Sequence, residues 1–400
     1  MELMYSKRAA MRGRDVRKGN EKLVLRLIQK EALLSQSEVV EMTGLKAPTI
    51  LRIFKNLEEA GLIQVSEIPK ETSEKKGRKP VYYRLNPEAL YVIGVEFWAL
   101  SATVVISNFI REPVYSSSVA IGKDSDGDAV LEIIYMLIKD SLKKKKIELE
   151  QLAGIGIGAP GKVDIEKGEV IYYSRINGLH GLPVAAYLEE RFEVPILVHN
   201  NCSVLAMNEY SSSHPADAEN IMAVLIRGGV GGAYINGGKI MTSGNITTME
   251  IGHMSVDPDG RQCSCGFKGC LETYLSEEAI LSDVGDSKNL PDIKYMDKQI
   301  SGISNDDSSK LKAVLDEKAK ILAYALKNLM HLFSPDLFLI ISRSIELSNY
   351  LSEKAFTFLN CVDDRSEGQN IRVKAVCYNP LHAGMGACDI VFQDFFSGDI

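Results

Sequence analysis

The 400-residue sequence lacks any apolar run long enough to span a bilayer. A membrane-spanning helix needs about 20 consecutive apolar residues, whereas the runs here, such as residues 337–341, have the length of a strand. The first 20 residues carry positive charge, but no apolar segment follows them. We therefore expect no secretory signal and a cytoplasmic protein with no membrane partner.

Cysteine is also scarce, with seven in the whole chain, and three of these fall within eight residues. An odd total in a cytoplasmic chain argues against a disulfide framework and favours a metal cluster plus buried thiols. The apolar fraction of 45% and the charged fraction of 25% are ordinary for a globular protein. They exclude a disordered chain, a fibrous repeat and a small disulfide scaffold.

Charge is divided unevenly along the chain. Residues 1–84 carry 18 Lys and Arg against 11 Asp and Glu, whereas the remainder carries 28 against 42. A basic head on an acidic body suggests that the head binds a polyanion. The alternative is chance clustering of solvated charge. We expect two domains, residues 1–86 and residues 87–400.

The basic head has the pattern of a helix-turn-helix. Residues 20–30 have a helical apolar stripe, and Ser35 with Glu38 has the spacing of a capping box that starts a second helix. Gly44 permits the left-handed turn that ends it, and a third helix is expected over residues 47–60. Two short strands, at 62–67 and 81–85, would form a wing.

The third helix would present its polar face to DNA. Thr49, Arg52 and Lys55 are predicted to enter the groove, and Asn56 is expected to point outward with them. Arg78 and Lys79 lie in a basic loop that could enter a minor groove, although linker charge is an equal alternative. The competing interpretation of the whole head is a helical hairpin with a solvated charged face.

After residue 87 the sequence alternates between strand and helix patterns, which predicts an α/β body of two lobes with a cleft between them. Strands are expected at residues 91–95, 103–107, 152–158, 195–198, 224–226, 337–341 and 371–375, and an amphipathic helix at 129–142. A glycine-rich stretch at 228–232 follows one of the strands.

The strongest chemical signal is one histidine followed by three closely spaced cysteines: His253, Cys263, Cys265 and Cys270. A Cys3His set suits tetrahedral Zn²⁺, and with all four positions filled by protein the site would be structural. The alternative is a cluster of reactive thiols.

Four segments together resemble the ROK family of repressors, open reading frames and kinases. They are GIGAPGKVD, HNNCSVLAMNE, RGGVGGA and EIGHMSVDPDGRQCSCGFKGCLE, in that order. With a winged helix in front, the chain resembles the repressor branch of that family. The resemblance implies a winged helix-turn-helix ahead of a two-lobed, actin-like body, a small sugar in the interlobe cleft, and a homodimer or homotetramer.

The resemblance also implies the sugar contacts, which would be Asn200, Asn201, Glu250, His253 and Glu272. His253 would bind zinc through one ring nitrogen and orient the sugar with the other. The competing interpretations are a helix-start carboxylate for Glu272 and a turn residue for Asn201.

The sequence departs from the kinase pattern at the phosphate loops. Residues 96–100 replace a D-x-G-G-T loop, so that Phe97 and Trp98 are expected to fill the phosphate position. Asn201 replaces a catalytic Asp, and an amide cannot take a proton. Arg227 replaces a loop glycine, and residues 342–344 replace a glycine run. We expect a sugar-responsive repressor, released by its sugar, that is not an enzyme. The alternatives are a DNA-binding sugar kinase and an architectural DNA-binding protein.

Overall fold

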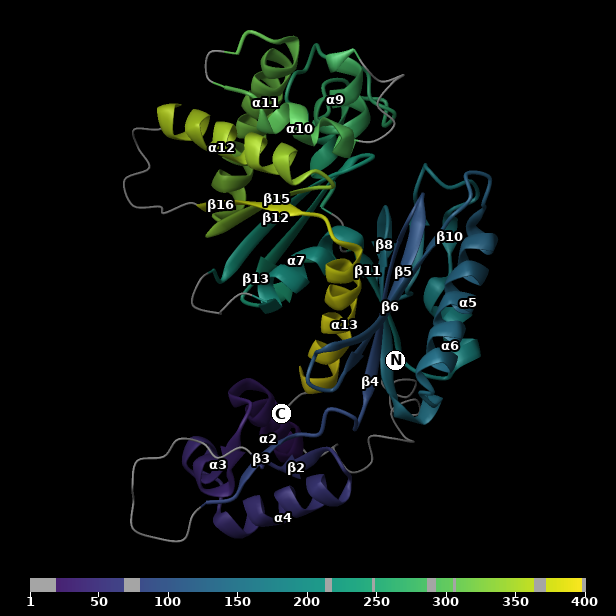
Figure 1. Cartoon of the computed structure of the whole chain (residues 1–400), viewed down its shortest axis with the longest axis vertical. Coiled ribbons are helices and arrows are strands. Elements are labelled where there is room, and N and C mark those ends of the chain that lie inside the picture. The colour runs from purple at the N-terminus through teal and green to yellow at the C-terminus, as the bar shows by residue number, and fades with distance from the viewer. Residues whose placement is uncertain are drawn as a thin grey trace.

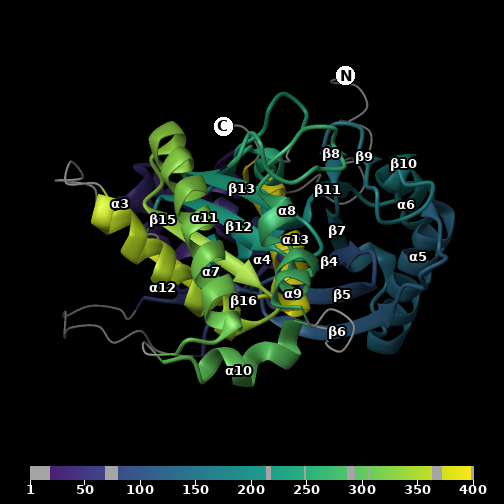
Figure 2. The same ribbon diagram turned by 90° about the horizontal axis from the view of Figure 1, so that it is seen from above.

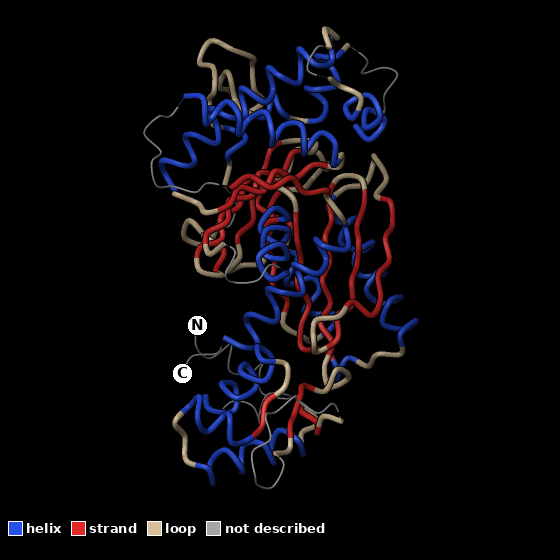
Figure 3. Tube along the Cα trace, turned by 60° about the vertical axis from the view of Figure 1, so that its left-hand side comes forward, coloured by secondary structure: helices blue, strands red, loops and turns tan. Residues whose placement is uncertain are grey.

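The computed structural model describes residues 19–67, 80–212, 218–246, 249–285, 293–304, 307–362 and 372–397. The chain forms a small N-terminal head and a body built around two separate sheets (Figures 1 and 3). Among the described residues, no helix combines the length and the apolar character that a membrane span requires.

The head is the predicted winged helix-turn-helix. Its elements are α2 (Gly19–Glu31), β1 (Leu34–Ser35), α3 (Gln36–Thr43), α4 (Ala47–Glu59), β2 (Ile63–Val65) and β3 (Tyr82–Leu85). The capping box forms, because the Ser35 N–H donates to Glu38 Oε2 over 2.8 Å and the Glu38 N–H donates to Ser35 Oγ over 3.3 Å. Gly44 has a φ of 68°, as the turn between α3 and α4 requires.

The core of the head comes from the apolar face of α4, with Ile50, Ile53, Phe54 and Leu57 all buried. The Phe54 ring meets Tyr83 edge to face at 5.0 Å and so packs the helix against the wing. The three strands have the order β1-β3-β2. Strand β1 was not predicted, because two residues are too few to show a period.

The first lobe contains a five-stranded sheet of order β11-β7-β4-β5-β6. Helices α5 (Gly127–Lys145) and α6 (Val184–Phe192) cover one face and form a core with the apolar side chains of β4 and β7 (Figure 2). The strands are β4 (Tyr91–Trp98), β5 (Ser101–Asn108), β6 (Pro113–Ala120), β7 (Leu152–Ala159) and β11 (Ile196–Asn200). A short sheet beside them has β8 (Lys162–Asp164), β9 (Glu169–Tyr172) and β10 (His180–Leu182), and η1 (Leu149–Gln151) precedes β7.

The second lobe contains the sheet β14-β13-β12-β15-β16. Its strands are β12 (Asn220–Ile226), β13 (Val230–Asn236), β14 (Lys239–Ile240), β15 (Leu337–Ser342) and β16 (Arg372–Cys377). Helices α9 (Glu277–Val284), α10 (Asp297–Ser301), α11 (Lys310–Phe333) and α12 (Ile345–Val362) lie above this sheet (Figure 1). The shorter helical elements of the lobe are η2 (Ile251–His253), α8 (Glu272–Leu275) and η3 (Ile293–Met296).

Helices α7 (Asn201–Ser212) and α13 (Pro380–Ser397) pack against each other between the two sheets (Figure 1). Glycine permits this contact, because a Cβ on Gly386 would lie 1.8 Å from the Val204 carbonyl oxygen. The far end of α13 reaches the head, where it contacts α2. Its Phe396 ring stacks on Phe109 of the first lobe at 5.8 Å. Helix α13 therefore touches the head and the sheet of the first lobe.

Candidate metal centre and ligand site

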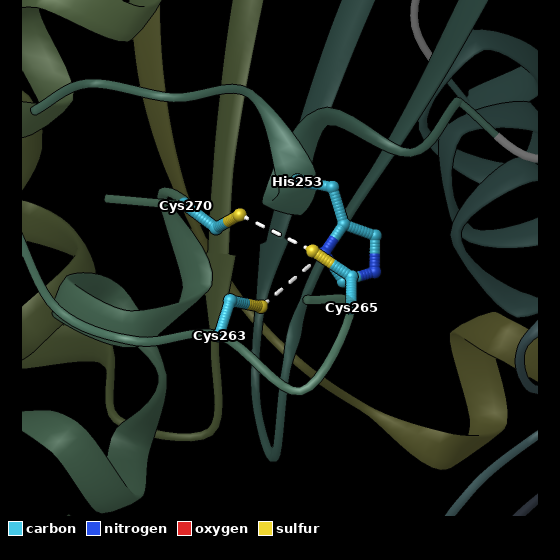
Figure 4. Close-up of side chains that lie close together, drawn as sticks. All are labelled: His253, Cys263, Cys265 and Cys270. Carbon is cyan, nitrogen blue, oxygen red and sulfur yellow. Dashed lines mark hydrogen bonds between the residues drawn. The ribbon is translucent and has the colours of Figure 1, made fainter. Parts of the chain in front are cut away.

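The four predicted metal ligands come together. The ligand atoms of His253, Cys263, Cys265 and Cys270 all lie within 4.8 Å of one another, and their side chains point toward a common centre (Figure 4). The Sγ atoms of Cys265 and Cys270 are 3.5 Å apart, and Cys263 Sγ is 3.6 Å from His253 Nδ1. The histidine ends η2, and the cysteines lie on the loop that leads into α8.

Glycines shape the cysteine loop. Gly269 has a φ of 69°, and a Cβ there would lie 1.6 Å from the Asp257 carbonyl oxygen. Gly266 has a φ of 93°, which lets the Cys263 N–H donate to the Phe267 carbonyl over 2.9 Å. The loop thus turns back on itself tightly enough to bring three sulfur atoms to one point.

A group of charged residues, which the sequence did not reveal, joins the same loop to helices α9 and α11. Arg261 donates to the Thr273 carbonyl over 3.0 Å and to both oxygens of Asp283 over 2.8 and 3.0 Å. Lys318 of α11, whose side chain is fully buried, also pairs with Asp283. No motif marks these residues, because α9 and α11 supply Asp283 and Lys318 from distant parts of the chain.

The donor set can hold a metal ion. Burial raises the pKa of the Cys270 thiol to about 12 and also raises the pKa of Cys263. Three thiolates at such a point need a cation to stabilise them, and a metal ion would supply that charge. Three sulfur atoms and one imidazole nitrogen are donors typical of a tetrahedral site.

Two carboxylates flank the histidine. Glu272 Oε1 lies 3.6 Å from His253 Nδ1 and accepts from Cys263 Sγ at 3.2 Å, and Glu250 Oε2 lies 3.9 Å from His253 Nε2. The structure therefore brings together three of the five predicted sugar contacts. A hollow of about 360 Å³ beside Glu250 is lined mainly by apolar side chains, so it does not suit the hydroxyls of a sugar.

The two predicted asparagines stand at the junction of β11 and α7, and both are buried. Asn200 is held at both ends of its amide, because Nδ2 donates to the Gly161 carbonyl over 2.7 Å and Oδ1 accepts from the Cys202 N–H over 2.8 Å. Asn200 thus fixes the loop after β7 to the start of α7. Among the described residues, none hydrogen-bonds to the Asn201 side chain.

The start of β13 connects α7 with the metal centre. A Cβ on Gly231 would contact Cys202, next to Asn201, at 3.7 Å. A Cβ on Gly229 would lie 3.1 Å from Glu272 Oε2. The glycine-rich stretch therefore lies between the asparagine pair and the Glu272 carboxylate.

The residues expected to replace the kinase phosphate loops include two members of a buried ionic cluster. Glu96 Oε1 accepts from Arg227 Nη1 and Nη2 at 3.1 and 3.2 Å, and Glu96 Oε2 accepts from the Tyr378 hydroxyl over 2.7 Å. The Arg227 guanidinium lies 4.8 Å from the centre of the Trp98 ring. The nearby Glu96 carboxylate helps to hold the pKa of Arg227 above its ordinary value.

The prediction that Phe97 fills the phosphate position is wrong. Successive side chains of a strand point to opposite faces, and Phe97 packs into the core under α5 and α6. Its neighbours Glu96 and Trp98 point toward the second lobe, where they meet Arg227. The Glu96–Arg227 pair, with the rings of Trp98 and Tyr378 on the guanidinium, occupies the site in place of the Phe97 ring.

The predicted DNA-binding face lies on α4, at the outer edge of the head (Figure 1). Arg52 and Lys55 are exposed and Thr49 is half-buried. Asn56 does not point outward as predicted, because its Nδ2 donates to Glu21 Oε1 over 2.9 Å and joins α4 to α2. Arg78 and Lys79 lie outside the described residues.

Head and body together define a class of protein: a winged helix-turn-helix joined to a two-lobed body of the sugar-kinase type. The model of the winged helix-turn-helix DNA-binding family matches residues 17–64, and the ROK family model matches residues 115–393. The chain belongs to the ROK family.

Named relatives match most of the length of this chain. The chain is 22% identical to the xylose repressor of Caldicellulosiruptor bescii over 94% of this chain and 96% of that protein. It is 27% identical to the transcriptional dual regulator NagC of Escherichia coli K12, over 84% of this chain and 83% of that protein. The crystal structure of a ROK family transcriptional regulator, a homologue of the E. coli MLC protein, has a TM-score of 0.81 at 21% identity, covering 96% of this chain and 98% of that one.

Proposed function

We propose that this protein is a transcriptional repressor that binds operator DNA through its head and is released by a small sugar bound in its body. The observation that carries the proposal is the Glu96–Arg227–Tyr378 cluster. It fills the place of the phosphate loops in a chain that keeps the sugar-side carboxylates and adds an exposed recognition helix. A body that can bind sugar but has no room for a phosphate donor suits a sensor rather than a kinase.

DNA binding is assigned to residues 1–86. Arg52 and Lys55 are exposed on the surface of the head and suit base or phosphate contacts in the major groove, with Thr49 beside them. Arg78 and Lys79 would follow the neighbouring backbone or minor groove. One helix-turn-helix covers a single half-site, so we expect a homodimer, or a dimer of dimers, on a palindrome.

Sugar binding is assigned to Asn201, Glu250, His253 and Glu272, with Asn200 positioning the start of α7. Carboxylates and amides suit the donors and acceptors of sugar hydroxyls. Because Asn201 cannot act as a general base, the bound sugar is expected to remain unchanged. The relatives named for xylose and for N-acetylglucosamine make these two sugars the first to test.

Zinc is the metal that best suits the donor set of His253 and the three cysteines. With four protein donors the ion would be structural, and would hold the cysteine loop and the imidazole in place. His253 would then use Nδ1, which faces Cys263 at 3.6 Å, for the ion. Its Nε2 would be left to hydrogen-bond a sugar or Glu250.

The linker between head and body offers a route for the signal. The Asn86 side chain donates to the Gly61 carbonyl over 2.9 Å, and the Phe109 N–H donates to the Pro87 carbonyl over 3.1 Å. The linker is thus bonded to both units, so that a movement of the first lobe would change the spacing of two heads on DNA. Sugar shifts DNA affinity only if it binds the two conformations unequally.

The test is a thermal-shift screen over pentoses, hexoses and amino sugars, followed by operator binding with each sugar that raises the melting temperature. If the sugar relieves repression, the protein should bind its operator more weakly when the same sugar is added without ATP. ADP release in a coupled assay with sugar and ATP would instead show a kinase. A melting temperature that no sugar changes would favour an architectural DNA-binding protein.

A further inference from the structure

Among the described residues, two ion pairs that join the lobes differ in depth. At the back, Glu96 of β4 pairs with Arg227 at the end of β12, with side-chain exposures of 1% and 6%. At the rim, Arg175 of the first lobe pairs with Glu278 of α9 in the second, with exposures of 37% and 71%. The rim pair is bidentate, because Nη1 is 2.9 Å from Oε1 and Nη2 is 3.2 Å from Oε2.

The rim pair also holds a turn of the ligand site. Arg175 donates a hydrogen bond to the Gly228 carbonyl, and a Cβ on Gly228 would lie 2.8 Å from the Arg175 guanidinium carbon. On the next residue, a Cβ on Gly229 would lie 3.1 Å from Glu272 Oε2. The Gly228–Gly229 turn is therefore held between Arg175 on one side and the Glu272 carboxylate on the other.

The two pairs should respond differently when the lobes move. Separating a buried pair leaves an uncompensated charge and costs a great deal. An exposed pair loses little, because water replaces the partner. Opening Arg175–Glu278 should therefore cost less than separating Glu96 from Arg227.

We propose that Arg175 is a positioning residue for the sugar response: a clasp that closes the lobes over the ligand and presses the Gly228–Gly229 turn toward Glu272. The inference rests on the proposed function, and it identifies a residue through which the site responds to closure of the two lobes. Arg175 lies outside the five predicted sugar contacts, and it acts through the turn rather than by touching the ligand.

The test measures, in the full-length protein, the concentration of D-xylose or N-acetylglucosamine that releases half of the bound operator DNA. Glu278→Gln should raise this concentration about two- to fivefold, the range for an exposed ion pair. Arg175→Ala should raise it further, to about tenfold, because it also removes the hydrogen bond to the Gly228 carbonyl. Arg175→Lys should fall between Arg175→Ala and the wild type, because lysine keeps the charge but cannot form the bidentate pair. Arg191→Ala is the matched control, since Arg191 is a first-lobe arginine that pairs with Glu190 on its own helix.

Two further readouts separate positioning from loss of structure. Operator affinity without sugar and the emission of Trp98 should remain those of the wild type in the Arg175 variants. Trp98 is the chain's single tryptophan, and it lies against Arg227 at the buried pair. Half-release concentrations equal to that of Arg191→Ala would overturn the clasp. A wild type that no sugar of the screen releases would overturn the proposed function itself, and the clasp with it.

Discussion

Removing Arg227 tests whether the cluster in the place of the phosphate loops holds the lobes together. Arg227→Met keeps most of the apolar stem and deletes the guanidinium. Glu96, which is fully buried, would then keep the Tyr378 hydroxyl as its hydrogen-bond donor. Leaving one partner of a buried ion pair uncompensated costs about 3–5 kcal/mol. We therefore expect Arg227→Met to lower the free energy of unfolding by about that amount.

The double variant Glu96→Gln/Arg227→Met separates the cost of an unpaired charge from the cost of lost packing. It removes both charges, so it should be more stable than Arg227→Met alone, and the two substitutions should show a large coupling energy. The assay is urea unfolding followed by the fluorescence of Trp98, which lies 4.8 Å from Arg227. Additive effects of the two substitutions would refute the argument, because they would show that the charges do not depend on each other.

The remaining predictions concern the head, the metal loop and the half-buried His199. Arg52→Ala should weaken operator binding by about 1–3 kcal/mol in a gel-shift titration, whereas Glu58→Ala on the same helix should not weaken it. Cys265→Ser should lower the zinc content measured on purified protein and abolish the sugar response, with operator binding retained. Gly269→Ala should destabilise the loop, because its Cβ would overlap a carbonyl. Burial lowers the pKa of His199 to about 4, below the ordinary 6.5. The stability that neutral His199 contributes is therefore complete above pH 6.5 and is lost as the pH falls toward 4. The free energy of unfolding, measured by urea unfolding at each pH, should be lower by about 2 kcal/mol at pH 5 than above pH 6.5. This contribution should be absent in His199→Gln.

Local patterns predicted the head well. Its helices and wing follow from signals within a few residues, such as the Ser35–Glu38 capping box and the Gly44 turn, and the structure contains both. The cysteine loop was predicted for the same reason, since its ligands are close in sequence and the spacing limits how they can fold.

Contacts between distant segments could not be predicted in this way. Glu96, Arg227 and Tyr378 meet only because the ends of β4, β12 and β16 lie close together, and no period or spacing in the sequence marks that meeting. The misplacement of Phe97 has a related cause. The motif showed that glycines were lost, but the face of the strand decides which replacement side chain points toward the second lobe. Helix α13 was also missed, although it contacts both the head and the first lobe.

We propose that a sugar that is not chemically changed controls the affinity of this protein for operator DNA. The direct measurement is the affinity of the full-length chain for an operator selected from random DNA, with increasing sugar and without ATP. We predict that a sugar of the thermal-shift screen weakens this affinity by roughly 5–150-fold, and that the sugar is recovered unphosphorylated. An affinity that stays constant at every sugar concentration would contradict the account.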